Sequence, residues 1–392
     1  MSTGAGSALP LSEEHEQLRR MVERFAAREV APVIGGYYER EEFPYPVVKK
    51  MGETGLFGLP FPEEHGGMGG DYVALCLAIE ELARVDSSVA ITLEAAVGLG
   101  AMPVYRFGTE AQKQRWLPDL CSGAALGAFG LTEPGGGSDA GAIRTTARRE
   151  DGWWALEGTK SFITNAGTDI TSLVIVAAVT GRGAGGERQI SCILVPAGTP
   201  GMVVSKKYSK VGWSASDTRE LSFSGCRVPV DHLLGEEGNG YRQFLQILDE
   251  GRVAIAALSV GLAQGCIDEC LGYLSEREAF GRKLGEYQVL QFKLADMEAR
   301  AHTARLAWYD AATRLMAGKP FKKQAAIAKL VASDAAMTNA REAAQIFGGY
   351  GFMNESPVGR FYRDAKVLEI GEGTSEIQRM LIARDLGLPP AT

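Results

Sequence analysis

The feature of this 392-residue sequence that most restricts its fold is a periodicity of apolar residues that changes twice along the chain. In the first third, apolar residues recur at helical spacing, as at Leu18, Met21 and Phe25. Short β-branched runs follow, separated by Gly-, Asn- and Asp-rich turns. Helical spacing then returns in long stretches at about 240–274, 284–317 and 322–347, and in a last one at about 375–385. Long helices with short connections are typical of a helix bundle.

This order predicts a multi-domain α+β protein. We expect an N-terminal helical domain over residues 1–125, a middle antiparallel, β-barrel-like domain over 126–238 and a C-terminal four-helix bundle over 239–392. Strands and helices are not expected to alternate in the middle domain, because its β-branched runs follow one another directly. The strands expected there are 161–164, 172–179, 189–195 and 202–206.

Two helices of the first domain have clear start signals. Asp71 is a suitable N-cap for a helix over 72–84, and Thr109 is a suitable N-cap for the next one. We expect Pro118 to end that second helix, because the residue before a proline is biased away from helical geometry.

The composition excludes several classes of protein. Lys and Arg number 41 against 48 Asp and Glu, so the formal net charge is −7 and no basic block is available for nucleic acid. The four histidines and six cysteines are scattered, which predicts no metal site and buried thiols in a reducing compartment. The N-terminus does not resemble a signal peptide, and the most apolar run, Val253–Ile267, is too short to cross a bilayer. We therefore expect a cytoplasmic protein without membrane insertion.

Two glycine-rich segments are candidate binding loops. PGGGSDAG at 134–141 has glycines like a dinucleotide-binding fingerprint, but strands are expected after it instead of a helix, so we reject the Rossmann interpretation. The segment is either a turn-rich connector or a loop whose backbone approaches a ligand. QIFGGYGF at 345–352 ends a long helix, and its glycines form either a C-cap or a nest of backbone N–H groups for phosphate.

Glu372 lies between two glycines just before the last helix. Ser375 and Gln378 are spaced as a capping box, so this helix is expected to begin near Glu376. Position alone favours an acid that is stabilised by the helix dipole. The alternative is a movable carboxylate that acts as a general base.

Seven motifs, in order and at matching spacing, resemble those of the acyl-CoA dehydrogenase family over nearly the whole chain. They are FGTEAQKQRWLPDL, LTEPGGGSDA, FITN, REAFGRKL, QFKLADM, QIFGGYGF and EGTSEIQR. The family has the helical, β and helical-bundle order expected above. The resemblance implies a homotetrameric FAD enzyme that oxidises an acyl-CoA to the trans-2-enoyl-CoA, in fatty acid or branched-chain amino acid catabolism. It also implies an electron-transferring flavoprotein as the electron acceptor.

By this resemblance, Glu372 is the base that removes the α-proton, and its own backbone N–H helps to polarise the thioester carbonyl. Some branches of the family place the base in the motif that reads LDEGR here, at the position of Gly251. Glycine cannot act as a base, so the chain resembles the branches that carry the base before the last helix. The neighbouring Glu250 stays a minor rival.

Further positions match the family's cofactor and substrate contacts. The resemblance places FAD on Phe129, Leu131, Thr132, Gly137, Ser138, Phe162, Ile163, Thr164, Arg277, Phe280, Gln288, Gln345, Phe347, Gly348, Gly349, Thr374 and Glu376. Of these, residues 277, 280 and 288 match positions that hold the ADP half, often across a subunit interface, and residues 345–349 match the pyrophosphate nest. The acyl-CoA is placed on Ser138, Asp249, Arg252 and Gly373. Arg252 has an alternative role in a salt bridge with Asp249 or Glu250 inside the bundle.

Some residues depart from the family pattern and bear on the substrate. Phe162 stands where members usually have Trp, so the contact of an indole N–H is lost. Gly371 stands where many members have Tyr, which predicts room for short or branched acyl groups. No Arg follows the VDS motif at 85–87, where glutaryl-type members use one to pair a distal carboxylate, so a free dicarboxylate is disfavoured. Glu94, further on, is expected to be a satisfied structural acid.

Three other functions stay open from the sequence. The same chemistry could act on an acyl group tethered to an acyl carrier protein, and the nucleotide end of the CoA site would distinguish the two. An acyl-CoA oxidase usually has a longer chain with an added C-terminal domain, for which 392 residues leave no room. A catalytically inactive helical scaffold would not need the flavin motifs or Glu372.

Overall fold

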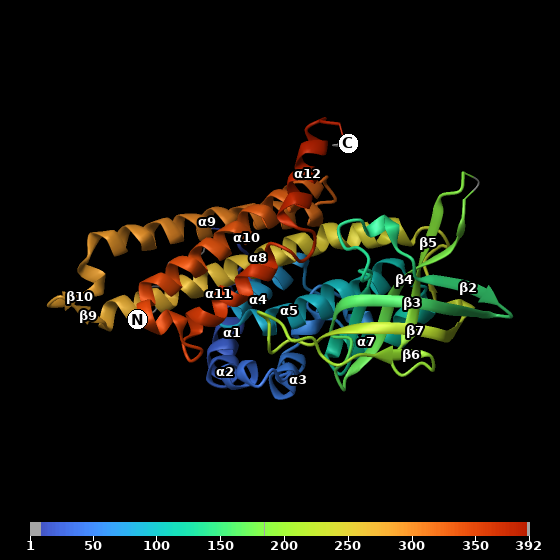
Figure 1. Cartoon of the computed structure of the whole chain (residues 1–392), viewed down its shortest axis with the longest axis horizontal. Coiled ribbons are helices and arrows are strands. Elements are labelled where there is room, and N and C mark those ends of the chain that lie inside the picture. The colour runs from blue at the N-terminus through green and yellow to red at the C-terminus, as the bar shows by residue number, and fades with distance from the viewer. Residues whose placement is uncertain (1–8, 184, 390–392) are drawn as a thin grey trace.

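The computed structural model describes residues 9–183 and 185–389. A helical first segment, a β-rich middle segment and a helical last segment follow one another, as predicted (Figure 1). The sheet lies at one end of the elongated molecule, and the small hairpin of β9 (Glu278–Ala279) and β10 (Arg282–Lys283) lies at the other. The long helix α8 (Gly240–Glu276) extends between these two ends.

The first segment is built from short helices. They are α1 (Glu13–Phe25), α2 (Ala31–Glu39), α3 (Tyr45–Glu53), α4 (Tyr72–Ala83), α5 (Ser87–Glu94), α6 (Met102–Phe107) and α7 (Glu110–Ser122), with π-helical turns η1 (Ala26–Val30) and η4 (Ala95–Ala101). The caps follow the sequence. Asp71 accepts a hydrogen bond from the N–H of Ala74 at 2.8 Å, and Thr109 forms a capping box with Gln112. Both predicted helix starts are therefore confirmed.

The expectation that Pro118 ends α7 is wrong. The helix continues through this proline to Ser122 and stops at Gly123, which has φ +73°. Proline removes one backbone N–H and leaves the later hydrogen bonds of the helix in place. The left-handed conformation of Gly123 is the stronger stop signal, and a Cβ atom there would lie 2.5 Å from the ring of Phe57.

The middle segment is one eight-stranded sheet. Its strands are β1 (Leu126–Gly130), β2 (Thr146–Glu150), β3 (Trp153–Thr164), β4 (Thr171–Arg182), β5 (Arg188–Pro196), β6 (Met202–Val204), β7 (Thr218–Pro229) and β8 (Leu233–Leu234). They follow the order β6-β7-β3-β2-β4-β5-β8, and β1 pairs with β4. The predicted strands 161–164, 172–179 and 189–195 lie within β3, β4 and β5, and the one predicted over 202–206 is confirmed in part, because β6 ends at Val204. Strand β7 was not predicted.

The sheet differs from the predicted antiparallel unit in one respect. Strand β1 runs parallel to β4, with Phe129 opposite Ile175, and β2 has a single parallel bridge to β4. A parallel pair requires a crossover connection, and here β2 and β3 supply it. After the glycine-rich loop at 134–141, a single 3-10 turn (Ala140–Ala142) leads into β2, and no α-helix follows the loop, so the loop is not a Rossmann fingerprint.

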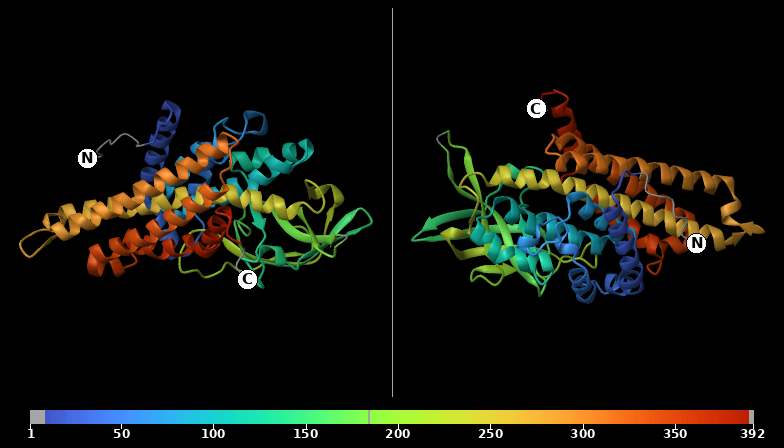
Figure 2. Two further views of the ribbon diagram at one scale, coloured as in Figure 1. Left: turned by 90° about the horizontal axis from the view of Figure 1, so that it is seen from above. Right: turned by 180° about the vertical axis from the view of Figure 1, so that it is seen from behind.

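The last segment contains the predicted long helices. Besides α8 they are α9 (Gln288–Met316), α10 (Lys322–Phe347), α11 (Pro357–Leu368) and α12 (Ser375–Asp385). The views in Figure 2 show α8, α9 and α10 lying side by side along the molecule. Many buried alanines line α10, from Ala325 to Ala343, which lets its neighbours approach closely.

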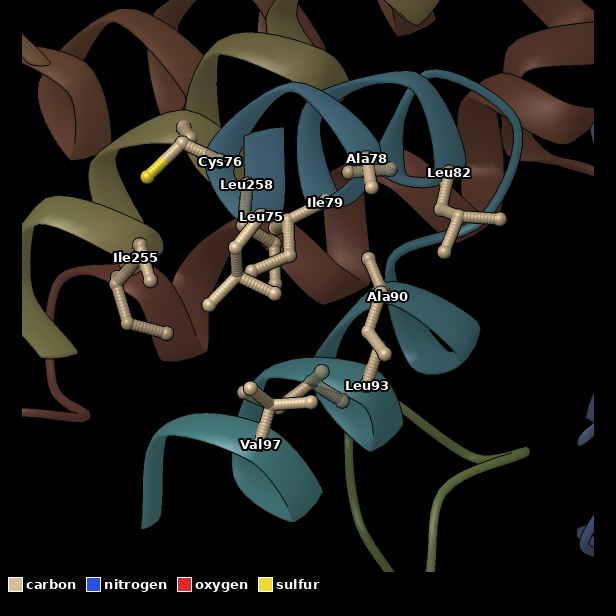
Figure 3. Close-up of a cluster of buried hydrophobic side chains, with 14 of the residues drawn as sticks. Leu75, Cys76, Ala78, Ile79, Leu82, Ala90, Leu93, Val97, Ile255 and Leu258 are labelled. Atoms are coloured by element: carbon tan, nitrogen blue, oxygen red, sulfur yellow. The ribbon is translucent and has the colours of Figure 1, made fainter. Parts of the chain in front are cut away.

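In the described part of the chain, two helical stretches are long and apolar enough to cross a membrane, 87–107 and 240–276, but 94% and 83% of their apolar windows are buried inside the protein. The interpretation that the run in α8 is too short is wrong, because the helix continues well beyond it. Its apolar side chains are covered by other helices. Figure 3 shows Leu258 of α8 in one buried cluster with Leu75 and Ile79 of α4 and Val97 of η4.

All three segments meet at the carboxylate of Asp364 on α11. This buried group accepts hydrogen bonds from the hydroxyl of Tyr38 on α2 (2.7 Å), the hydroxyl of Ser87 on α5 (2.6 Å) and the backbone N–H of Trp213 in the middle segment (2.7 Å). Buried donors that lose their acceptor pay the full cost of desolvation. The position of α11 is therefore fixed relative to the other two segments.

Replacing Asp364 with Ala should lower the free energy of unfolding by about 3 kcal/mol, because three buried donors lose one acceptor. Urea denaturation at one fixed protein concentration measures the change. Asp310→Ala is the matched control. It removes an exposed helical pair with Arg314, which should cost less than about 1 kcal/mol. Equal losses in the two variants would contradict the joining role of Asp364.

Candidate active site

Glu372 lies on a tight turn between α11 and α12. Its φ is +54° and that of the following Gly373 is +87°, so two successive residues have left-handed backbone conformation. A side-chain N–H of Gln378 donates to the carbonyl oxygens of Glu372 (3.2 Å) and Gly373 (2.8 Å), and Nζ of Lys329 donates to the latter at 2.8 Å. These bonds from α12 and α10 hold a conformation that a non-glycine residue rarely adopts.

The predicted capping box at the start of α12 is wrong by one residue. The helix begins at Ser375, and Thr374 is its cap, accepting from the N–H of Ile377 at 3.3 Å. Gln378 is a residue type that can complete a capping box. Here, however, its side chain donates to the backbone carbonyl oxygens of Glu372 and Gly373. The sequence pattern thus found the helix end, whereas tertiary contacts decided the partner of Gln378.

The carboxyl group of Glu372 is removed from water although the residue is only partly buried as a whole. Its Oε2 atom is buried and has no hydrogen-bond partner among the residues that the structure describes. Burial raises the pKa of Glu372 to about 7, and the charges of Arg252 and Lys329 oppose this rise. A helix dipole alone would lower the pKa of an acid, so desolvation is the larger effect here.

Glu94 on α5 is a second buried carboxyl beside the first. Within the described parts of the chain, neither of its oxygens has a hydrogen-bond partner, so the expectation of a satisfied structural acid is wrong. Burial and the neighbouring Glu372 raise its pKa well above the usual value. Two carboxyl groups that share a dry site cannot both be ionised at low cost. We therefore regard Glu94 as the protonated member of the pair at neutral pH.

Gly251 on α8 faces both carboxyl groups. A Cβ atom built there would lie 3.1 Å from Oε2 of Glu372 and 3.6 Å from Oε1 of Glu94. A side chain at position 251 and the side chain of residue 372 thus reach the same place. Glu250, the rival base, is paired elsewhere, because its carboxylate contacts Arg106 at 3.2 Å.

The predicted substrate residues on α8 form an ion pair with one another. Arg252 binds Asp249, and Lys322 lies 3.7 Å from the same carboxylate. The salt-bridge alternative for Arg252 is therefore present, although its Nε atom is buried and has no hydrogen-bond partner in residues 9–183 and 185–389. Ser138, predicted for both ligands, is exposed on the loop after β1.

The predicted flavin residues near this site come from β1, β3 and the segments after them. Strand β1 lies against η4 at a close approach of Gly127 and Gly100, where a Cβ on Gly127 would be 2.8 Å from the Cα of Gly100. Buried Lys160 donates to the carbonyl of Leu131 at 3.0 Å and to Glu133 at 2.7 Å, which fixes the chain after β1. Leu131 and Ile163 are buried, while Phe129, Thr132 and Thr164 are half-buried and Gly137 is exposed.

Backbone strain gathers at predicted site residues. Of seven non-glycine residues with positive φ in the described parts of the chain, three are predicted contacts: Phe162, Phe280 and Glu372. Phe162 is also 66% exposed and Phe280 97% exposed. Large apolar rings held in strained, exposed positions indicate surfaces that a ligand covers, and aromatic faces suit a flavin or an adenine.

The other predicted cofactor residues lie at the far end of the bundle. Arg277, Phe280 and Gln288 are exposed at the end of α8, in the hairpin and at the start of α9, and Gln345, Phe347, Gly348 and Gly349 end α10. The rings of Phe347 and Tyr273 stack at 4.2 Å, which brings these two sets together. Gly348 is the C-cap of α10 with φ +59°.

These two groups of residues are too far apart for one cofactor on one chain. Phe244 of α8 touches Phe129 of β1 at 4.1 Å between ring centroids, and Tyr273 marks the other group. They are 29 residues apart on α8, or about 43 Å. An extended dinucleotide is shorter than this distance.

A pocket of about 530 Å³ lies at the end of the glycine-rich loop, next to the predicted residues Gly137 and Ser138, which do not line it. Its lining includes Asp139, Arg188, Tyr241 and Arg242. Arg242 is seven residues before the predicted substrate residue Asp249, so the two share a face of α8. This helical spacing was the sequence signal from which Arg242 could have been predicted as a site residue. No sequence signal pointed to Lys329 or Arg188, because only the fold brings these residues to the site.

Among the residues that the structure describes, no group of three or more His, Cys, Asp or Glu is placed to hold a metal ion. All six cysteines are free and buried, as expected.

Models of three domains of one family match the chain in sequence. They are the N-terminal domain (residues 12–124), the middle domain (128–226) and the C-terminal domain (238–387) of acyl-CoA dehydrogenase. The chain belongs to the acyl-CoA dehydrogenase family. The resemblance of the seven motifs is thereby confirmed, and so is the predicted fold class.

Relatives of this acyl-CoA dehydrogenase align over almost its full length. A probable acyl-CoA dehydrogenase of Bacillus subtilis is 48% identical over 376 residues, covering 96% of this chain and 98% of the relative. The mouse mitochondrial short-chain specific acyl-CoA dehydrogenase is 44% identical, with 97% and 91% covered. The solved structure of butyryl-CoA dehydrogenase from Megasphaera elsdenii has a TM-score of 0.93 and 40% identity, with 97% and 100% covered.

Gly251→Ala in this acyl-CoA dehydrogenase should reduce the rate of substrate oxidation by roughly tenfold. The added methyl group would lie 3.1 Å from Oε2 of Glu372 and displace the carboxyl by a few tenths of an ångström. FAD content and thermal stability should stay near the wild type. Gly272→Ala on the same helix is the control, because its methyl group meets no atom within 4 Å. Equal rates in both variants would show that Gly251 does not set the position of Glu372.

Proposed function

We propose that Glu372 is the base that removes the α-proton of the substrate in this FAD-dependent acyl-CoA dehydrogenase. The observation that carries the proposal is the buried Oε2 atom, which has no hydrogen-bond partner among the described residues, on a carboxyl group whose pKa is raised to about 7. A carboxyl group whose pKa is raised towards neutral pH binds an abstracted proton more strongly than an exposed carboxylate does, and it can still ionise before the reaction. Glu250 is a poorer candidate because its charge is balanced by Arg106.

FAD, when bound, accepts the β-hydride of the acyl chain. The rest of the chemistry belongs to the protein's own residues. They hold the acyl group at Glu372, exclude water from the buried carboxyl pair and, through the backbone N–H of Glu372, polarise the thioester oxygen. The family binds FAD, and a Bacillus anthracis acyl-CoA dehydrogenase, 32% identical with a TM-score of 0.90, is described as complexed with it, this chain covering 68% of that one.

The exposed, strained Phe162 supports a flavin site formed by Phe129, Leu131, Thr132, Gly137, Ser138, Phe162, Ile163 and Thr164, with Thr374 and Glu376 beside the catalytic turn. We propose that Arg277, Phe280, Gln288 and residues 345–349 hold the ADP half of a cofactor whose flavin lies on a second copy. The length of α8 between Phe244 and Tyr273, which contact the two groups, is about 43 Å and supports this proposal. It agrees with a homotetramer, in which each site needs residues from two chains.

We propose CoA as the acyl carrier instead of an acyl carrier protein. The pocket beside Ser138 is lined by Arg188 and Arg242, and guanidinium groups suit the phosphates of a nucleotide. From there, α8 leads to Asp249 and Arg252, which we assign to the substrate together with Gly373. We further propose that the enzyme acts in the cytoplasm. We also propose that its domain boundaries lie near residues 125/126 and 238/239.

An electron-transferring flavoprotein is our proposed electron acceptor. Among the solved structures similar to this chain is one described as the electron transferring flavoprotein of Acidaminococcus fermentans, with a TM-score of 0.93 and 41% identity, and 97% and 99% of the two chains covered. This description supports an association between enzymes similar to this chain and an electron-transferring flavoprotein.

We propose short, uncharged acyl groups, straight or branched, as substrates. The relatives described as short-chain specific and as butyryl-CoA dehydrogenase support this class. Gly371 adds no side chain next to Glu372, and the protonated, unpartnered Glu94 offers no positive charge to a second carboxylate.

Replacing Glu372 with Gln should lower the rate of flavin reduction by about 10²–10⁴-fold while FAD stays bound. The measurement is an anaerobic absorbance titration with short, branched and medium acyl-CoAs. In the wild type the rate should rise as the pH increases through about 7, because the base must lose its proton first. Near-normal reduction in this variant would refute the base assignment, with Glu250→Gln tested next.

The same titration distinguishes the alternatives. A wild-type flavin that bleaches only with an acyl group on a carrier protein would refute CoA as the carrier. A pure protein without flavin would support the inactive scaffold.

Replacing Gly371 with Tyr should raise the preference for straight over branched acyl-CoAs by roughly tenfold in kcat/KM, since a bulky ring takes up space beside the base. The backbone allows the change, because a Cβ there would lie 3.4 Å from its nearest neighbour, the carbonyl oxygen of Val367. Gly371→Ala serves as the control for the loss of glycine. An unchanged acyl profile would show that position 371 does not select the substrate.

A further inference from the structure

Lys329 is a buried charged group beside the catalytic turn that the reaction described above does not use. It lies on α10, and its side chain is fully buried. In the described part of the chain, its Nζ atom reaches one hydrogen-bond acceptor, the carbonyl oxygen of Gly373 at 2.8 Å, and makes no ion pair. An ammonium group has three donors and is costly to bury, so its place here calls for a compensating interaction.

The compensating charge is that of Glu372. Burial lowers the pKa of Lys329 to about 8, and the attraction of Glu372 is the largest effect that opposes this. Glu369 and Asp334 act in the same direction more weakly, while Arg252 repels the ammonium group.

Four other titratable groups surround the carboxyl of Glu372 from separate helices: Tyr72 on α4, Glu94 on α5, Arg252 on α8 and Lys329 on α10. Burial raises the pKa of Tyr72 and of Glu94 well above their usual values, so both are neutral near pH 7. The charge of Arg252 is partly balanced by its partner Asp249. Lys329 is the cation near Glu372 without an anionic partner of its own among the described residues.

We propose that Lys329 is a positioning residue for Glu372, which holds the carbonyl side of the Glu372–Gly373 turn and keeps the carboxyl of Glu372 ionised before the substrate is deprotonated. The inference rests on the proposal that Glu372 is the base. The two effects can be separated experimentally. Gln378 also donates to the carbonyl oxygen of Gly373, at 2.8 Å, but carries no charge. Both residues thus hold the turn, in what we call the tether, whereas Lys329 alone of the two supplies a positive charge.

The test uses two matched variants of the full-length enzyme. Lys329→Gln keeps a donor for Gly373 and loses the charge, whereas Gln378→Met loses the tether and leaves the charge. Two properties are followed against pH: the rate of flavin reduction by a short acyl-CoA, and, in the resting enzyme without substrate, the infrared band of the protonated carboxyl of Glu372. The band is assigned by subtracting the spectrum of Glu372→Gln.

In Lys329→Gln, the pH at which Glu372 is half protonated should rise by about one unit, because a nearby positive charge favours the carboxylate. The rate at pH 7 should fall roughly fivefold and approach the wild type at high pH. Gln378→Met should lower the rate at every pH and leave the midpoint in place. Lys329→Arg, which keeps the charge, should have a midpoint close to the wild type.

An unmoved midpoint in Lys329→Gln, or an equal shift in Lys329→Arg, would overturn the proposal. The failure of the base assignment gives a different result. If Glu372→Gln still reduces the flavin, both proposals fall. If Glu372→Gln is inactive and the midpoint of Lys329→Gln is unchanged, the assignment of Lys329 alone falls.

Discussion

The hydrogen bonds of Asp364 are the constraint on which the rest of this structure depends. One buried carboxylate joins Tyr38, Ser87 and the backbone of Trp213, which belong to segments far apart in the sequence. Next to it, a Cβ on Gly212 would lie 2.6 Å from the carbonyl oxygen of Arg363, so the two backbones meet without space for a side chain. Helix α11 is thus fixed both by the hydrogen bonds of Asp364 and by the close contact of its backbone with Gly212. It ends at Leu368, four residues before Glu372, and therefore sets where the turn that carries the proposed base can lie.

Burial then decides the chemistry of that turn. A carboxyl at the start of a helix on the surface would be ionised at every physiological pH. Here desolvation raises the pKa of Glu372 to about 7, and the cations Arg252 and Lys329 keep it from rising further. Gly251 contributes by having no side chain, because any larger residue would contact the carboxyl. The absence of a side chain at Gly251 therefore leaves room for the proposed base, and the charges of Arg252 and Lys329 limit its pKa. These three residues lie on α8 and α10, outside the turn that carries Glu372.

The parts of the fold that could be predicted from the sequence depend on local rules. Asp71 and Thr109 cap their helices through bonds within four residues, and the apolar spacing found each of the long helices. Pro118 misled because a single proline is a weaker stop than the left-handed Gly123. The parallel pairing of β1 with β4 joins residues more than forty positions apart, which no local pattern encodes.

The same division holds within the site. Motif resemblance named Glu372 by position, but not the conditions around it. Glu94 was expected to have partners, and its isolation became visible only when α5, α8 and the turn were placed together. Lys329 lies in an unremarkable helical run, and its contact with Gly373 spans 44 residues. The sequence thus located the proposed base, whereas the groups that set its pKa could be found only from the fold.

The length of α8 links cofactor binding to assembly. The helix carries Phe244 beside the proposed flavin strands and Tyr273 beside the proposed ADP residues, about 43 Å apart. If both groups bind the same kind of cofactor, each must be completed by another chain, which is the arrangement that we propose. This accounts for Phe280 and Phe352, which are 97% and 92% exposed at that end of the bundle, and for Val289 and Phe292 near them, which are also exposed. Large apolar side chains gathered at one end of a chain indicate a covered surface. On our proposal the cover is FAD together with a second copy, so a monomer of this chain would hold two half-sites and no complete one.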